Sequence, residues 1–273
     1  MRKQIFIAIY IVTAVLLVGL YATEKAFTEK PLTVEEKVTK LFEKWNNPGS
    51  PGAAVAVIKD GMVVYRNGFG CAQMEYNVPI TPSTIFHVAS VSKQFPAFAI
   101  TMLEKQGKLS VDEDIRKYLP WMPDFGHTIT IRHLLNHTSG IRDQWELLMF
   151  SGWRMEDVIT QKDILYLLKR QRELNFKPGE QYMYSNSGFT LLTEIISRIT
   201  GQPFVEWVDE NIFKPLGMNS THFHIDHQQI VKNRAYSYRQ DRKRGLVRSI
   251  LNYANVGATS LFTTVEDMAN WMR

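Results

Sequence analysis

The sequence predicts an α/β fold of the α+β type, in which a helical region packs on an antiparallel sheet. Two β-rich runs, 53–58 and 62–65, flank Asp60-Gly61, which is the strongest short signal for a β-hairpin. Apolar residues recur with helical spacing in two later stretches, 90–107 and 188–199. With 273 residues, 45% of them hydrophobic, the chain is long enough for one large domain or two small ones.

The first 23 residues form the clearest targeting signal. Arg2 and Lys3 precede an uncharged apolar run that continues to Ala22, and a short basic start before such a run directs export. Leu20-Tyr21-Ala22 is a poor cleavage site, and the run is long enough for a span of about twenty residues. We therefore expect residues 1–23 to be a signal peptide or an uncleaved membrane anchor, with the rest of the chain outside the cytoplasmic membrane.

Residues 24–48 form a charged connector with one apolar helical face. That face comprises Val34, Val38, Leu41, Phe42 and Trp45. The loop at 46–52, rich in Asn, Pro and Gly, then opens the main domain, which we expect over residues 49–273.

A serine and a lysine stand together at the start of the 90–107 helix. Ser90 and Lys93 are three residues apart and share a helix face, next to the free backbone N–H groups of the first turn. A lysine can take a proton from serine if burial favours its neutral form, and Phe95 and Phe98 would provide that burial. Chance alone places a Ser and a Lys three apart about once in a chain of this length, so the rest of the sequence must decide.

Three further helices are predicted between residues 110 and 174. They are a short capped helix at 110–120, a helix at 128–140 that ends at Gly140, and a long helical stretch at 145–174. His133 and His137 are four apart and are able to share a metal ion. We favour the alternative, in which one histidine packs and the other bonds to backbone at the helix end.

A phenol and an amide precede the 188–199 helix. In an extended segment alternate side chains point the same way, so Tyr184 and Asn186 are expected to face one cleft. A phenol near an ammonium is able to carry protons, and an amide is able to position the lysine or hold a substrate amide.

Five motifs occur in order: SVSK, LLNHTSGI, FKPGEQYMYSN, IFKPLGMNSTHF and GATSLFTTVEDMANWM. Together they resemble the serine β-lactamase and penicillin-binding-protein superfamily, in its class C and esterase-like branch. The resemblance implies that Ser90 is the acylated nucleophile, Lys93 its base partner, Tyr184 a second proton carrier and Asn186 a substrate-binding residue. It implies neither a metal nor an organic cofactor.

The third motif of that superfamily, Lys-Thr-Gly or His-x-Gly on a strand, is not found in the 273 residues. The resemblance therefore implies that C-terminal strands of the sheet, and with them the second oxyanion donor, are missing. On this interpretation the chain is a truncated form with little or no activity.

One motif competes with the serine site. Residues 222–227 match a His-x-His-x-Asp-His pattern, in which metallo-hydrolases hold zinc. No histidine follows His227, and the motif lacks the apolar strand that should precede it, so surface histidines are the favoured alternative.

The amino-acid composition excludes some of the remaining classes of protein function. The net charge of +5 is concentrated in residues 239–248, which read as a solvated loop and not as a nucleic-acid surface. The single cysteine, Cys71, excludes an internal disulfide. We expect an exported serine hydrolase that acts on an amide, β-lactam or ester carbonyl of a small-molecule or peptidoglycan-like substrate, with a membrane contact through the N-terminal segment. A non-catalytic envelope binding protein is the alternative, and the oligomeric state is not indicated.

Overall fold

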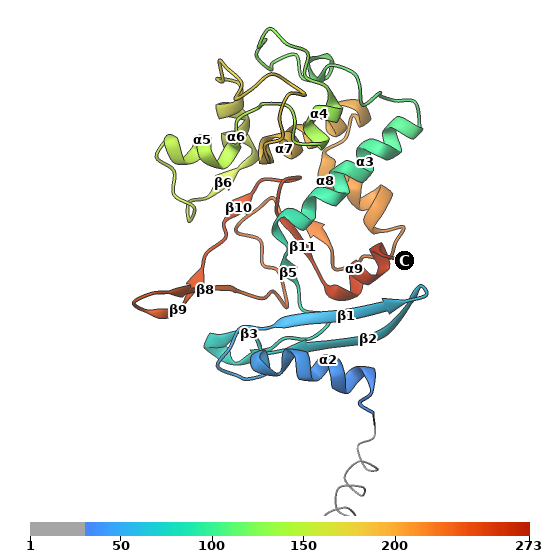
Figure 1. Ribbon diagram of the computed structural model, residues 1–273, viewed down its shortest axis with the longest axis vertical. Helices are drawn as coiled ribbons and strands as arrows, with labels where there is room; N and C mark the ends of the chain where they lie inside the picture. Colours follow the sequence, from blue (N-terminus) through green and yellow to red (C-terminus); the bar gives the residue numbers. More distant parts are fainter. Residues whose placement is uncertain (1–30) are drawn as a thin grey trace, which may run out of the picture. The chain divides into compact units, whose positions relative to one another are not determined.

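The computed structural model describes residues 31–273, so the predicted targeting segment at 1–23 lies outside the described residues. The chain divides into two units, whose described residues are 31–43 and 44–273 (Figure 1). In the first unit, the predicted connector helix is present as α2 (Val34–Phe42). The Thr33 hydroxyl accepts the Glu36 N–H, and the Glu36 carboxylate accepts the Thr33 N–H. This reciprocal pair is a capping box, which gives both backbone N–H groups an acceptor at the start of the helix. Within residues 31–273 no helix has the length and apolar character needed to span a membrane.

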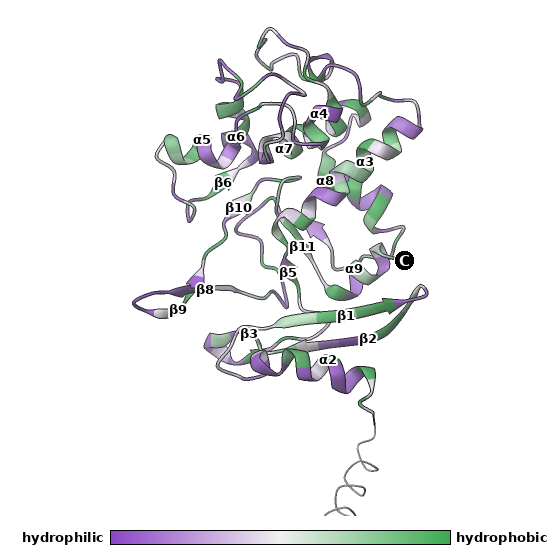
Figure 2. Ribbon diagram, in the orientation of Figure 1, coloured by the Kyte–Doolittle hydropathy of each residue, from purple (hydrophilic) through white to green (hydrophobic). Residues whose placement is uncertain are grey.

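A 3₁₀ turn, η1 (Glu43–Trp45), follows α2, and the predicted hairpin lies in the second unit. Strands β1 (Ala53–Lys59) and β2 (Met62–Phe69) pair antiparallel, with Lys59 opposite Met62. Asp60 and Gly61 both have positive φ, 51° and 74°, which is the backbone that a two-residue hairpin turn requires. β1 is an apolar strand, green in Figure 2. A smaller antiparallel pair, β3 (Cys71–Gln73) and β4 (Val78–Pro79), follows around the turn η2 (Met74–Tyr76).

A three-stranded antiparallel sheet leads directly into the segment that carries Ser90. Its central strand β11 (Leu261–Thr263) pairs with β5 (Phe86–His87) on one side and with β7 (His222–Phe223) on the other. His87 and His222 both lie opposite Phe262. Since β5 runs directly into residue 89, this sheet fixes where the next helical turn begins.

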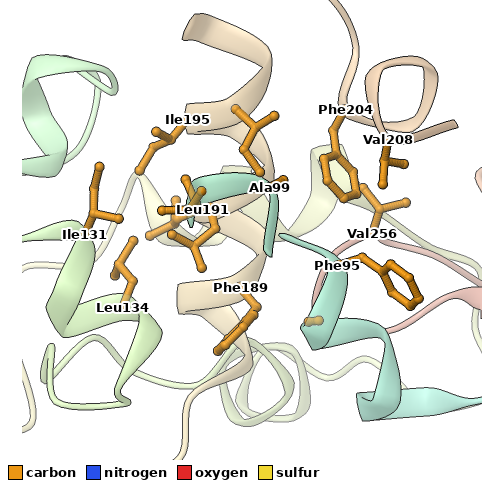
Figure 3. Packing of buried hydrophobic residues seen from close by; sticks show 14 of the residues in the cluster. Phe95, Ala99, Ile131, Leu134, Phe189, Leu191, Ile195, Phe204, Val208 and Val256 are labelled. Carbon is orange, nitrogen blue, oxygen red and sulfur yellow. The ribbon is translucent and has the colours of Figure 1, made fainter. Parts of the chain in front are cut away.

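The helical region follows. Its elements are η3 (Ala89–Lys93), α3 (Gln94–Lys105), η4 (Ile115–Lys117), α4 (Ile131–Leu135), α5 (Gln144–Phe150), α6 (Gln161–Leu168), α7 (Asn186–Thr200), α8 (Phe204–Val208) and the π-helical turn η5 (Asp209–Phe213). Side chains from α3, α4, α7 and α8 meet in one apolar cluster (Figure 3). Phe95, Ile100 and Leu103 of α3 are fully buried there, and each such side chain stabilises the fold by about 1.5–3 kcal/mol.

The remaining elements of the second unit are a hairpin, a short parallel strand pair and a C-terminal helix. β8 (Ser237–Asp241) and β9 (Gly245–Ser249) form a second hairpin, and β10 (Tyr253–Ala254) pairs parallel with β6 (Ile159–Thr160). After β11, helix α9 (Val265–Trp271) begins at Thr264, whose hydroxyl accepts the Asp267 N–H.

The hairpin, α3 and α7 confirm the sequence prediction, and α7 ends as expected at Gly201, which has a φ of 70°. The sequence predicted more helix over residues 110–174 than the structure contains. Thr130 is extended because it bridges Asp114, and only 131–135 form α4. Gly152, with a φ of 87°, lies in the loop after α5, so 145–174 form two short helices and strand β6. The 110–120 segment contains only the turn η4, capped by Asp114.

The fold class is nevertheless the predicted mixture of helices and antiparallel sheets. Among the described residues the strands form several small sheets, of which one pair, β6 and β10, is parallel.

Candidate active site

Ser90 stands on a tight turn between β5 and α3. Ala89, just before it, has a φ of 45°, a left-handed backbone that is unusual for alanine. Residues 89–93 form the 3₁₀ turn η3, in which side chains three apart eclipse, so the lysine at 93 lies directly beside the serine. Ser90 and Lys93 therefore lie side by side, as predicted. The side chain of Ser90 is exposed, whereas Lys93 is only 8% exposed.

Ser92 holds this turn in place. Its buried hydroxyl donates to the carbonyl of Ala89 and accepts the backbone N–H of Leu261 at 3.1 Å. The second serine of the SVSK motif therefore ties the turn that carries Ser90 to β11, a role that the sequence did not reveal.

The amine of Lys93 has three partners. The Nζ atom donates to Ser90 Oγ at 3.1 Å, to Asn186 Oδ1 at 2.8 Å and to the carbonyl of Ala258 at 2.8 Å. Burial lowers the pKa of Lys93 to about 8, and the negative charge of Asp143 acts in the opposite direction. The amine is therefore partly neutral near neutral pH, the state in which it accepts a proton.

The side chains of Tyr184 and Asn186 reach the Ser90–Lys93 pair from the same side, as their alternation predicted. Ser185 between them is extended, with φ −136° and ψ 120°, so the two neighbouring side chains point the same way. The Tyr184 hydroxyl donates to Ser90 Oγ at 2.9 Å, and the Lys93 Nζ lies 4.9 Å from the centre of the phenol ring. All four residues named from the sequence thus lie together.

Asp143 belongs to the same cluster and was missed. Its Oδ2 accepts the backbone N–H of Asn186 at 2.6 Å and the side-chain amide of Asn186 at 2.8 Å. The same residue caps α5 by accepting the Trp145 N–H. Its position two residues before a tryptophan fits a helix-cap signal, but nothing local links it to residue 186, which is 43 positions away.

This arrangement can be compared with known proteins. A family model described as Beta-lactamase matches residues 34–273. The chain belongs to the Beta-lactamase family.

Individual relatives agree. The chain is 35% identical to Penicillin-binding protein 4* of Bacillus subtilis over 66% of its own length and 40% of that protein. It is 33% identical to a D-aminopeptidase of Gluconobacter oxydans over 83% of its own length and 42% of that protein. The chain therefore spans less than half the length of these curated relatives.

Solved structures give the same result. An octameric penicillin-binding protein homologue from Pyrococcus abyssi has a TM-score of 0.75 and 32% identity, covering 86% of this chain and 54% of that one. A D-amino acid amidase from Ochrobactrum anthropi has a TM-score of 0.67 and 25% identity, covering 80% and 62%. The predicted resemblance to β-lactamases and penicillin-binding proteins is confirmed.

His137 packs against the phenol ring of Tyr184. It has a φ of 58°, and its ring lies 4.4 Å from that of Tyr184 and 5.2 Å from that of Phe189. Its Nδ1 accepts the Ser185 N–H at 3.1 Å. His133 instead accepts the N–H of Thr130 at the start of α4. The favoured alternative gave packing to one histidine and a backbone bond to the other; in the structure both bond to backbone, and His137 also packs against aromatic rings.

The segment 255–261 carries the carbonyl that holds the lysine. Gly257 has a φ of 85°, and a Cβ there would lie 2.5 Å from the carbonyl oxygen of Phe189, so a glycine is required. On the far side of Ala258, the Ser260 N–H donates to His87 Nε2 at 3.1 Å. The segment is thus fixed on both sides of the carbonyl.

The competing zinc motif does not form a site in the described structure. His222 stacks on Phe262 in the three-stranded sheet, with ring centres 5.5 Å apart, and His224 is 3% exposed. In residues 31–273 no three His, Cys, Asp or Glu side chains are grouped to hold a metal. The favoured alternative of surface histidines was also wrong for His224, because this side chain packs 4.7 Å from the Phe262 ring.

Proposed function

We propose that the chain is a serine hydrolase that works through an acyl-enzyme on Ser90. The observation that carries this proposal is the position of Ser90 Oγ, 3.1 Å from the amine of Lys93 and 2.9 Å from the hydroxyl of Tyr184. A serine is a weak nucleophile until a neighbouring base takes its proton, and here both a base and a proton carrier are within hydrogen-bond reach.

The three partners of Lys93 suit its neutral form. A neutral amine has two N–H groups and one lone pair. If the two N–H groups go to Asn186 Oδ1 and to the carbonyl of Ala258, both at 2.8 Å, the lone pair is left facing Ser90. In this state Lys93 accepts the serine proton, and the other two contacts hold the amine in place.

The reaction then proceeds in two halves. Ser90 Oγ forms a bond to the substrate carbonyl carbon while its proton passes to Lys93, and the backbone N–H of Ser90 stabilises the oxyanion. When the bond to the leaving group breaks, that group takes a proton through Tyr184, which Lys93 replenishes. Water then attacks the acyl-enzyme, loses its proton to the same pair and releases the acid and free Ser90.

For the substrate, we propose an amide or peptide carbonyl next to a D-amino acid. Support comes from the relatives, which include a D-aminopeptidase at 33% identity and a D-amino acid amidase at 25% identity. A β-lactam and a simple ester carry carbonyls that the same groups are able to attack, so both serve as probes.

We also propose that the protein is exported. Support comes from the basic start and apolar run of residues 1–23, which the sequence pattern assigns to a signal peptide or a membrane anchor.

The test is the intact mass of the full chain after exposure to a penicillin, an activated ester and a D-alanine amide, with Ser90→Ala as the matched control. We expect the mass of an acyl group on the parent protein and none on the variant. A folded parent protein that gains no mass from any of the three would overturn the proposal and favour a non-catalytic binding protein. Adducts of equal yield on Ser90→Ala would place the nucleophile elsewhere.

A further inference from the structure

A small polar pocket lies beside the β8–β9 hairpin, well apart in sequence from the serine motif. Its volume is about 150 Å³. β8 is one of the purple, hydrophilic segments in Figure 2. The polar side chains of the pocket are two guanidiniums, three hydroxyls and an amide, from Arg234, Arg248, Tyr236, Ser237, Ser249 and Asn252. None of the described residues that line it carries a carboxylate.

Both guanidiniums are held by aromatic rings. Arg234 Cζ lies 4.7 Å from the centre of the Phe262 ring, and Arg248 Cζ lies 5.0 Å from the centre of the Tyr236 ring. A stacked guanidinium uses its flat face for the ring, so the N–H groups at its edge stay available. These edges are the part of arginine that binds carboxylates and phosphates in pairs of hydrogen bonds.

The charge of Arg234 has no counterion. Within residues 31–273, neither Arg234 nor Arg248 forms an ion pair. The Nε of Arg234 is buried without a hydrogen-bond partner, and burial lowers the pKa of this side chain. A buried charged donor that lacks a partner is costly, and a bound anion would remove that cost.

Two carboxylates near the hairpin are engaged elsewhere. Glu75 accepts the hydroxyl of Tyr238 at 2.5 Å, and its field reaches Arg248 without a hydrogen bond. Asp241 lies 3.7 Å from Arg239 of the same strand and 3.5 Å from Arg244 in the turn of the hairpin. Neither acid neutralises the pocket.

We propose that this pocket binds a small anionic group, a carboxylate or a phosphate, through the guanidiniums of Arg234 and Arg248. The anion comes either from a free molecule or from the substrate of Ser90. The second source rests on the proposed function. The substrate is a possible source because the pocket is linked to the serine site through neighbouring residues. Asn252 of the pocket precedes Tyr253, whose ring lies 6.4 Å from that of His87. His87 is three residues before Ser90.

The first arm of the test measures binding of inorganic phosphate to the full chain by calorimetry, which needs no activity. We expect saturable binding that Arg248→Gln weakens at least tenfold. Arg234→Gln should weaken binding in the same way. Arg248→Gln is the better test because Arg248 is exposed, so its replacement should not disturb the packing of the fold. Arg239→Gln, on β8 of the same hairpin, is the matched control. Equal weakening by Arg239→Gln would show only general attraction to a basic hairpin and would overturn the proposal.

The second arm separates the two sources. Acylation of Ser90 is compared for activated esters of succinic acid, which is anionic, and of butyric acid, which has the same length and is neutral. A preference for the succinyl ester that is lost in Arg248→Gln and competed by phosphate identifies the substrate as the source. Phosphate binding without that preference identifies a free anion. The absence of both saturable phosphate binding and the preference overturns the proposal, while a butyryl adduct still supports the proposed function.

Discussion

The carboxylate of Asp143 fixes which way the amide of Asn186 points. Its Oδ2 accepts the amide N–H at 2.8 Å, so the amide oxygen is turned towards Lys93, 2.8 Å from its Nζ. The side chain of Asn186 thus has no choice of orientation, because a reversed amide would place its oxygen against a carboxylate. Asp143 acts on the lysine through Asn186 and is a positioning residue.

We therefore predict that Asp143→Ser slows acylation of Ser90 by about 10- to 100-fold, since a small displacement of a catalytic group has effects of that size. Serine is itself a good helix cap, so the start of α5 should keep most of its stability. The measurement is the rate of acyl-adduct formation by mass, together with the melting temperature. An acylation rate equal to that of the parent, in a variant of equal melting temperature, would refute this function of Asp143.

The sequence revealed those parts of the site that are local. Ser90 and Lys93 are three residues apart, and Tyr184 and Asn186 two apart, so helical and extended periodicity place each pair. The parts that were missed join distant segments. The contact of Lys93 with the carbonyl of Ala258 spans 165 positions and uses backbone, which leaves no signal in the side chains.

The fold shows the same limit. The Asp60-Gly61 turn and the end of α7 at Gly201 follow from local backbone preferences, and both were predicted. The strand β6 at Ile159–Thr160 was read as helix because it is two residues long and exists only through its pairing with β10, nearly a hundred residues later. Short elements that depend on tertiary pairing cannot be recognised by periodicity.

The pH dependence of acylation should report the lysine. Its pKa of about 8 means that about a tenth of Lys93 is neutral at pH 7. Acylation should therefore slow by about tenfold for each unit below pH 8 and level off above it. Lys93→Arg should lose at least about 100-fold at every pH, because arginine stays charged and offers no lone pair. A rate that is flat from pH 6 to 8 would show that Lys93 does not act as the base.

The contact between His87 and Ser260 should contribute to stability. The Ser260 N–H donates to His87 Nε2 at 3.1 Å, and the backbone there has a φ of 70°. His87→Leu leaves this N–H without an acceptor, which costs about 1–3 kcal/mol. His87→Gln keeps an acceptor at a similar distance and should lose less than half as much. The measurement is the free energy of unfolding in urea, and equal losses in both variants would show that packing, not the hydrogen bond, is the cause.

The buried histidines make stability depend on pH. Burial lowers the pKa of both His87 and His224 to about 4, and Arg234 adds to the effect in each case. The unfolded chain takes up these protons near pH 6.5 and the folded chain only near pH 4, so between those values the unfolded state binds more protons. The stabilisation is therefore complete above pH 6.5 and is lost as the pH falls towards 4.

We predict that the melting temperature falls between pH 6.5 and 5, before most carboxylates titrate. His224→Leu removes one of these titrating groups, and it replaces a ring whose nitrogens are both buried without partners. This variant should therefore show a shallower fall than the parent. His127→Leu, which replaces an exposed histidine, is the control variant. If His224→Leu and the parent lost stability at the same rate over this range, His224 would not be the group that titrates.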